Sequence, residues 1–391
     1  MADSTTSISL LSYDRDNGEH TRSIATSRSA TTITACRHRL AVLEEGEDDR
    51  SASVTEYTVC PLTEHISRTH TTPFVIKSIA CGAEHTLVLA DDGRLFSTGS
   101  NQHGQLGRST PRERSSDPQL APVSCMPSER IASIACGYFC SFAVTVEGEL
   151  WAWGDNRYGQ LGIPSTHSET VLEPVMVSIS PTFKVKQVSS GYAHTWVLSR
   201  QQNQLASTGN NQHGQLGTGD RVSLDGGWNL LQSTVPIEEV SCGNWVTILL
   251  TIPGDVFQAG VGPSPISEPT LQQDGTEAVS ISEQSSSAME EDTDTLPLLT
   301  VLGPPPATTT GSLECVPPRR VPLPEDAEIT AISSGCMCSG AVDDYGKVFI
   351  WRSDSPEEPH AFSGSLRYRK IAALSSSVAV CQSDRVDARI A

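Results

Sequence analysis

The chain has 391 residues, 37% of them hydrophobic and 19% charged, proportions ordinary for a soluble protein with a large core. Its 46 acidic and 27 basic residues give a formal net charge of −19, which repels nucleic acid and favours basic protein partners. Residues 1–10 lack the features of a signal peptide, and no segment has the length of a membrane span. We therefore expect no direct nucleic-acid binding, no membrane association and a cytoplasmic or nuclear location.

Two stretches near the start of the chain resemble parts of a unit that returns more clearly further on. Residues 10–18 read L-L-S-Y-D-R-D-N-G, similar to a later W-A-W-G-D-N phrase, and residues 37–46 align without gaps on residues 84–93. We assign a degenerate repeat unit to residues 33–60 and part of another to residues 8–18.

Three strong copies of the unit follow, at residues 76–107, 131–162 and 185–217. The first contains I-A-C-G-A-E-H-T-L-V-L-A-D-D-G-R-L-F-S-T-G-S-N-Q-H-G-Q-L-G, and the other two repeat this phrase with substitutions. Their glycines at 82, 137 and 191 are spaced by 55 and 54 residues, a period found in solenoids, propellers and arrays.

Each unit has the pattern of short strands joined by tight turns. Apolar residues Leu87, Leu89 and Leu95 alternate around Asp91-Asp92-Gly93, where glycine permits the positive φ of a hairpin. No run has a helical period over a useful length. Because three or four strands cannot bury both of their faces alone, radial stacking of the units is expected, and the predicted fold is an all-β propeller.

Two fainter units, at residues 237–262 and 329–354, keep the glycine, and residues 368–381 resemble the opening of a unit that then stops. The second half of that unit is the phrase at residues 8–18. The two chain ends would therefore build one blade together, closing a monomeric ring of seven blades with N- and C-terminal strands.

An insertion separates the two faint units, because Gly243 and Gly335 are 92 residues apart where earlier steps are 52 to 55. Residues 263–326 are rich in Ser, Pro, Thr, Gln and acidic residues, a composition typical of disorder. Within them, Leu296–Leu302 is an apolar island that either supplies a strand to a neighbouring blade or docks a partner, and we favour the strand.

These phrases resemble the regulator of chromosome condensation repeat family, whose pattern is C-G-x-x-H-T, D-G-x-L-x-x-W-G and N-x-x-G-Q-L-G. The resemblance covers residues 33–351 and both ends, and implies a seven-bladed β-propeller. The short, degenerate ring is also similar to the alpha-tubulin-suppressor type of this family. The chain departs from the pattern where Cys140, Val246 and Cys338 replace the recurring histidine.

The repeated polar residues point to structural roles rather than to catalysis. His85 and His194 recur at one repeat position, which favours a hydrogen bond between blades over membership of a single active site. Aspartates at the hairpin turns favour the bend and form no acid–base pair. We expect no enzyme activity, and assign structural repeat roles to Gly82, His85, Gly137, Gly191, His194, Gly243 and Gly335.

The eleven cysteines fall mostly inside the repeat phrases, as at Cys81, Cys136 and Cys242, where a small buried side chain suffices. Cys336-Met337-Cys338 and Cys36-Arg37-His38 lack the spacing of a zinc knuckle. Reduced core thiols are expected, with no metal site and no cofactor.

Partner contacts are expected in the connections between blades. Arg112 and Arg114 lie in the connection after the first strong unit, where solvated loop charge is the alternative interpretation. Trp228 follows two glycines in a polar stretch, and is either a buried anchor or an exposed contact residue.

Three functions are consistent with these features, and a non-enzymatic protein-interaction scaffold is the first, since it needs only the ring and its varied loops. The family resemblance also implies a guanine-nucleotide exchange factor for a small GTPase, although no wedge loop or basic N-terminal tail is identifiable. The alpha-tubulin-suppressor resemblance implies an accessory subunit that partners a small zinc protein in wobble-uridine tRNA modification and diphthamide synthesis.

Overall fold

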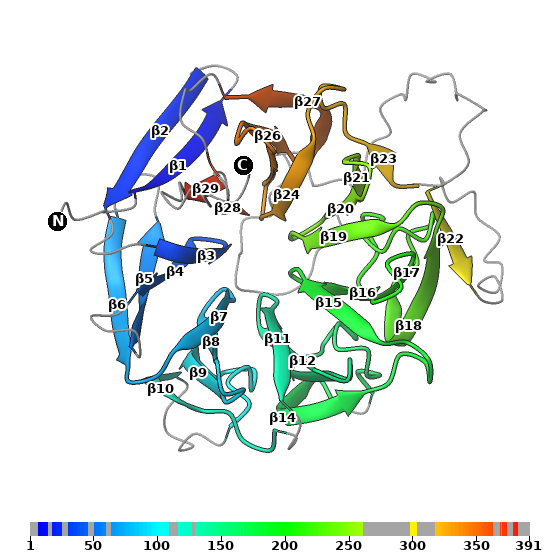
Figure 1. Ribbon diagram of the computed structural model, residues 1–391. Coiled ribbons are helices and arrows are strands. Elements are labelled where there is room, and N and C mark those ends of the chain that lie inside the picture. The colour runs from blue at the N-terminus through cyan, green and yellow to red at the C-terminus, as the bar shows by residue number, and fades with distance from the viewer. Residues whose placement is uncertain are drawn as a thin grey trace, which may run out of the picture.

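The computed structural model describes most of the chain, in the ranges 7–14, 18–25, 30–45, 51–59, 64–108, 116–126, 130–166, 168–260, 298–302, 317–362, 368, 370–373 and 378–381. Across these ranges every regular element is a β-strand, and no helix that could cross a membrane occurs among them. Seven antiparallel sheets stand around a central channel as the blades of a propeller (Figure 1). The predicted all-β, seven-bladed fold is therefore confirmed.

Each of the first three blades contains four strands. Blade 1 comprises β3 (Ala30–Cys36), β4 (Arg39–Glu45), β5 (Ala52–Val59) and β6 (Glu64–Thr72). Blade 2 comprises β7 (Ile76–Cys81), β8 (His85–Ala90), β9 (Leu95–Ser100) and β10 (Ser116–Pro122). Blade 3 comprises β11 (Ile131–Cys136), β12 (Cys140–Thr145), β13 (Leu150–Asp155) and β14 (Thr170–Val177).

The next three blades keep this plan, but one has an extra strand. Blade 4 comprises β15 (Val185–Ser190), β16 (His194–Ser199), β17 (Gln204–Gly209), β18 (Leu224–Ser233) and β22 (Leu299–Leu302). Blade 5 comprises β19 (Ile237–Cys242), β20 (Thr247–Thr251), β21 (Val256–Ala259) and β23 (Arg319–Arg320). Blade 6 comprises β24 (Ile329–Ser334), β25 (Cys338–Asp343), β26 (Val348–Arg352) and β27 (Ser355–Ala361).

Both chain ends form blade 7, as predicted. Its strands are β28 (Lys370–Ala373), β29 (Val378–Cys381), β1 (Ser7–Asp14) and β2 (Gly18–Ala25). Strands β1 and β29 pair antiparallel with Ile8 opposite Cys381 and Leu11 opposite Val378, so main-chain hydrogen bonding between the two ends closes the ring.

The local sequence explains the strands and their turns. The second strand of a blade is buried along its whole length in β8, β12, β16, β20 and β25 because a neighbouring blade covers each of its faces. The hairpins that follow β8 and β12 place Gly93 at φ 91° and Gly148 at φ 80°, a backbone conformation in which a Cβ atom is strained. The predicted hairpin glycines are thus where tight turns require them.

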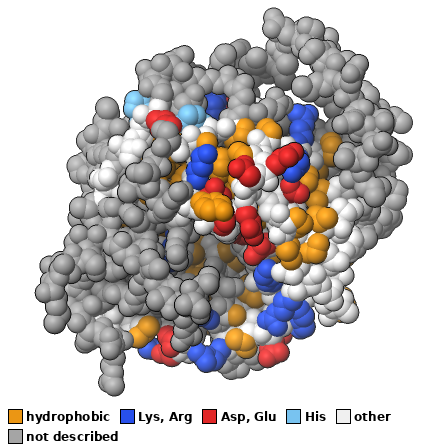
Figure 2. Space-filling model, turned by 45° about the horizontal axis from the view of Figure 1, so that its top comes forward, with side chains coloured by type: hydrophobic (Ala, Val, Ile, Leu, Met, Phe, Trp, Pro, Cys, Tyr) orange, Lys and Arg blue, Asp and Glu red, His pale blue; other side chains and the backbone are white. Residues whose placement is uncertain are grey.

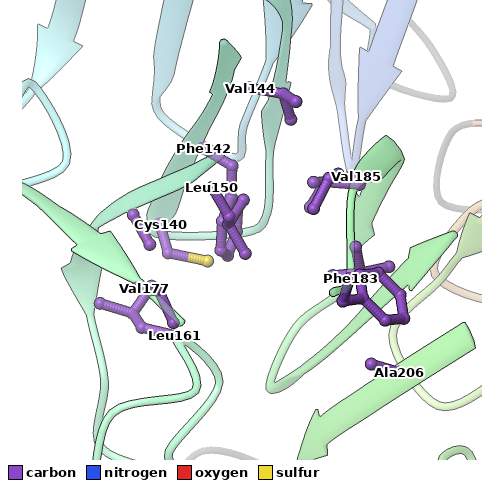
Figure 3. Close-up of a cluster of buried hydrophobic side chains, with 12 residues drawn as sticks. Cys140, Phe142, Val144, Leu150, Leu161, Val177, Phe183, Val185 and Ala206 are labelled. Atoms are coloured by element: carbon purple, nitrogen blue, oxygen red, sulfur yellow. The ribbon is translucent and has the colours of Figure 1, made fainter. Parts of the chain in front are cut away.

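The core is divided into apolar clusters, several of which lie between adjacent blades. Figure 3 shows one, in which Phe142 and Leu150 of blade 3 face Val185 and Ala206 of blade 4 and Phe183, which precedes that blade. Phe142 and Leu150 are almost completely buried. Each seam therefore behaves like a small hydrophobic core, and a blade is stable only between its neighbours.

The outermost strands lie beyond the repeat units predicted from the sequence. In blades 1 to 4 the fourth strand begins after the expected unit end, inside stretches interpreted above as connections. These edge strands carry polar residues and prolines, which weaken their pattern. Within the expected disordered insertion 263–326 the structure describes β22 and β23, and residues 263–297 and 303–316 lie outside the described ranges.

Candidate partner-binding face

The repeated histidines are joined to the next blade by matching hydrogen bonds. His85 Nε2 lies 2.9 Å from Ser141 Oγ, and His194 Nε2 lies 2.9 Å from Thr247 Oγ1. The Ser141 hydroxyl donates to the carbonyl of Gln105 at 2.8 Å, so its oxygen accepts the Nε2 proton of His85. Burial lowers the pKa of both imidazoles to about 3, so they are neutral at physiological pH. Both histidines are completely buried between blades, so a substrate cannot reach them.

The repeat glycines allow the blades to touch at one end of the channel. A Cβ atom on Gly82 would lie 2.8 Å from the carbonyl oxygen of Gly137, and a Cβ atom on Gly137 would lie 2.5 Å from Ser190 Oγ. Through these approaches Ala83 N donates to Tyr138 O at 3.0 Å. The seven assigned structural residues therefore lie at blade seams or beside the channel.

The residues that follow these glycines form a cluster of aromatic rings on one face. Adjacent strands in a blade are antiparallel, so the first and third strands end on the same face of the ring. The loops at these two ends carry the rings of what we call the aromatic belt, which consists of His103, Tyr138, Phe139, Tyr158, Tyr192, His213 and Trp245.

The rings of the aromatic belt contact one another across four blades. Tyr192 is central, with its ring centroid 4.9 Å from that of Tyr138, 5.7 Å from Trp245 and 6.4 Å from Tyr158. At the margins, the ring centroid of His103 lies 4.8 Å from that of Phe139, and the ring centroid of His213 lies 5.0 Å from that of Trp245. Tyr138 is buried, Tyr158 is 40% exposed and the other rings are partly exposed. The result is an apolar surface that also offers the polar groups of its tyrosine, histidine and tryptophan side chains.

Two arginines border the aromatic belt. The guanidinium of Arg37 lies 5.7 Å from the ring centroid of Tyr138, a cation–π contact. Arg157 pairs with Asp155 at 2.8 Å beside Tyr158. Burial raises the pKa of Tyr138 and of Tyr192, so both phenols stay protonated hydrogen-bond donors. Figure 2 shows acidic, basic and hydrophobic side chains mixed on the face it presents.

A central cavity of about 280 Å³ is lined by the innermost strands of the blades. Five cysteines line it: Cys36, Cys81, Cys136, Cys242 and Cys336. Two of these thiols donate across seams, Cys136 to Ala80 O at 3.4 Å and Cys242 to Ser189 O at 3.2 Å. Burial raises the pKa of Cys136 and of Cys242, so their thiols stay protonated. Among the described residues no three His, Cys, Asp or Glu side chains are grouped to hold a metal ion.

Of the three residues proposed from the sequence as partner contacts, Trp228 is the one that lies within the described ranges. Arg112 and Arg114 lie outside the described residues, and the neighbouring Arg108 is buried against Asp117, 2.8 Å away. Trp228 lies in strand β18 rather than in a loop, because blade 4 has its outer strand there. Its partly buried indole packs against Gly162 and the cluster of Figure 3.

The aromatic belt was missed because its residues differ from blade to blade. The pattern around each repeat glycine is regular, whereas the two positions after it are Ala-Glu, Tyr-Phe, Tyr-Ala and Asn-Trp in blades 2 to 5. Aromatic residues at the variable positions of a repeat are the signal that could have revealed it.

The comparisons with known proteins agree with this architecture. Models of the regulator of chromosome condensation (RCC1) repeat match residues 92–144 and 147–198, and residues 76–105 and 131–160. The human probable E3 ubiquitin-protein ligase HERC6 is 32% identical over 209 residues, which are 53% of this chain and 20% of that protein. The chain therefore spans about a fifth of the length of that relative.

Two solved structures share the whole ring. Human WBSCR16 superposes with a TM-score of 0.69 at 14% identity, covering 97% of this chain and 100% of that chain. Yeast RCC1 (Prp20), solved bound to Kap60, superposes with a TM-score of 0.68 at 16% identity, covering 98% of this chain and 90% of that chain. These likenesses establish the fold. The matched models show that the chain carries regulator of chromosome condensation repeats within residues 76–198.

Proposed function

We propose that this protein is a non-enzymatic protein-interaction scaffold whose contact surface is the aromatic belt. The observation that carries this proposal is the set of mutually contacting, partly exposed rings on one face, contributed by loops of successive blades. Aromatic side chains are enriched at the energetic centres of protein interfaces. Because the ring holds them in place, a partner that binds them pays little ordering entropy.

The chemistry of the surface favours a partner segment with basic side chains. A net charge of −19 attracts cationic proteins at long range, and the faces of tyrosine and tryptophan accept guanidinium groups. Arg37 on Tyr138 is an example of this contact within the chain itself. Tyr192 and Trp245, which are partly exposed, would receive the partner's cations in the same way.

The test is capture of partners from the protein's own cells with the full chain and with a Tyr192→Ala, Trp245→Ala double variant. Tyr345→Ala is the matched control, because Tyr345 is 65% exposed in the hairpin between β25 and β26, on the opposite face. We expect the double variant to lose the main partner by at least about tenfold, roughly 1.4 kcal/mol or more, while the control retains it. Equal retention by both variants would rule out the aromatic belt as the contact surface.

The same capture separates the more specific roles. If a small GTPase is retained and excess GTP releases it, the protein is an exchange factor, because such factors bind the nucleotide-free state most tightly. If a small zinc protein or tRNA-modification subunits are retained regardless of GTP, the protein is an accessory subunit. Both outcomes keep the scaffold role, and the effect of the double variant shows whether the aromatic belt serves it.

A further inference from the structure

Blade 4 carries a strand that its architecture does not need. The other six sheets are complete with four strands, whereas β22 adds a fifth along the outer edge of β18. This strand comes from the insertion between β21 and β23 of blade 5, so the chain leaves blade 5, covers the edge of blade 4 and then returns (Figure 1). Since blade 4 would remain a four-stranded sheet without it, β22 occupies this edge as a tethered ligand would.

The backbone of β18 presents a regular row of groups to this added strand. Ser233 N donates to Asn203 O at 2.8 Å, which directs the main chain of Ser233 toward the inner neighbour. Since successive residues of a strand alternate in direction, Gln232 and Thr234 direct their main-chain groups outward. Thr234 N donates to Leu298 O at 3.0 Å, and Gln232 is opposite Thr300.

Two adjacent leucines anchor the added strand. Leu298 and Leu299 are 7% and 8% exposed, and they join a cluster that includes Trp196 and Leu231 of blade 4. Leu299 Cδ1 lies near Gly217, where the absence of a Cβ leaves room for it. The edge therefore selects an extended segment with consecutive large apolar residues, through its main chain and through this apolar cluster.

We propose that the outer edge of β18 is a strand-addition site for an extended apolar segment of a partner protein, and that β22 occupies it in cis. Strand addition to a sheet edge is a common mode of peptide recognition, in which main-chain hydrogen bonds supply affinity and pockets supply specificity. Because β22 is covalently attached, its effective concentration is high, and a partner must compete with it. The site shares no residue with the aromatic belt.

The test uses a labelled peptide of residues 296–303 and two forms of the whole chain, the unmodified one and a variant with residues 298–302 replaced by Gly-Ser repeats. We expect the peptide to bind the variant at least about tenfold more tightly than the unmodified chain, because the cis competitor is gone. N-methylation of the peptide at the Thr300 position should weaken binding about tenfold or more by removing a donor that faces β18. The matched peptide methylated at the Val301 position, whose main chain faces away, should bind nearly as well as the parent.

Absence of binding to the replacement variant, or equal weakening by both methylated peptides, would overturn the proposal. Should the variant aggregate, the readout becomes its soluble yield on refolding with each peptide present. The parent and Val301-methylated peptides should then restore solubility, whereas the Thr300-methylated peptide should not. Failure of the parent peptide to restore solubility would equally overturn the proposal.

Discussion

At the scale of single residues, the repeated polar side chains of this propeller join blades. The carbonyl of Gln105 accepts from Ser141 Oγ at 2.8 Å and from Trp153 Nε1 at 3.0 Å. The carbonyl of Gln215 is used in the same way, by Thr247 at 3.0 Å and Trp196 at 2.9 Å. These two carbonyl groups thus satisfy buried donors of their own blade or the next. The glutamine side chain itself recurs because its Oε1 accepts a main-chain N–H of its own turn in all three G-Q-L-G phrases: Gln105 from His103 at 2.8 Å, Gln160 from Tyr158 at 2.9 Å and Gln215 from His213 at 2.9 Å.

Glu239 is a partly buried carboxyl group that makes stability depend on pH. Glu239 lines the channel, where burial raises its pKa to about 7. The negative charge of Glu238 also raises this pKa, whereas the hydrogen bond from Ile332 N–H and the positive charge of Lys186 lower it. A folded-state pKa above the unfolded value of about 4.5 means that ionisation destabilises the fold. The free energy of unfolding should therefore fall as pH rises from about 4.5 to about 7.

We expect Glu239→Gln to abolish this dependence and to stabilise the protein at pH 8 by up to about 3 kcal/mol, with little change at pH 4. Urea unfolding at the two pH values measures the effect. The neighbouring and exposed Glu238 supplies the control, Glu238→Gln. A variant no more stable than the parent at pH 8 would show that Glu239 is hydrated and ionised without cost.

At the scale of elements, the inner three strands of a blade and its outer strand obey different constraints. The second strand is buried on both faces and is apolar throughout, which makes the unit recognisable. The outer strand packs by one face only and tolerates polar residues, prolines and irregular register. An example is β14, whose pairing with β13 shifts register between Ala152 and Gly154 of β13. A residue such as Trp228 is therefore easily assigned to a loop from sequence.

Trp228 tests the placement of β18. Its indole packs over Gly162 on the seam between blades 3 and 4, so we expect Trp228→Ala to lower the free energy of unfolding by about 1–3 kcal/mol. Partner binding should be unchanged, because Trp228 packs on Gly162 at the end of the loop that carries Tyr158, and its indole makes no ring contact with the described residues of the aromatic belt. Trp245→Ala is the reciprocal variant, expected to reduce binding with little loss of stability. If Trp228→Ala loses the partner at an unchanged melting temperature, the residue is a contact.

At the scale of the whole molecule, the ring is held shut by main-chain pairing of two segments at opposite ends of the chain. Strand β1 pairs with β29, and apolar residues of both pack with blade 6 in one cluster. Leu11 is 2% exposed within it. Since every blade depends on its neighbours for burial, a weakened closure should affect the entire ring rather than one blade.

We expect Leu11→Ala to cost about 2–5 kcal/mol and to shift the unfolding transitions followed by tryptophan fluorescence and by circular dichroism together. Leu172→Ala, which truncates a leucine 64% exposed on β14, is the matched control and should be nearly neutral. Separate transitions by the two probes would mean that blade 7 unfolds alone and does not close the ring cooperatively.

The repeat, the all-β class, the seven blades and the closure by both ends could all be predicted from the amino-acid sequence. These features follow from local spacing and from apolar runs that must be buried on both faces, as in β12 and β16. Only the tertiary structure brought Tyr138, Tyr192 and Trp245 together, placed Trp228 in a strand and carried β22 back to blade 4. The reason is that residues in contact between neighbouring blades are about fifty positions apart in the sequence. Their contacts depend on the geometry of the ring and leave no local periodicity in the sequence.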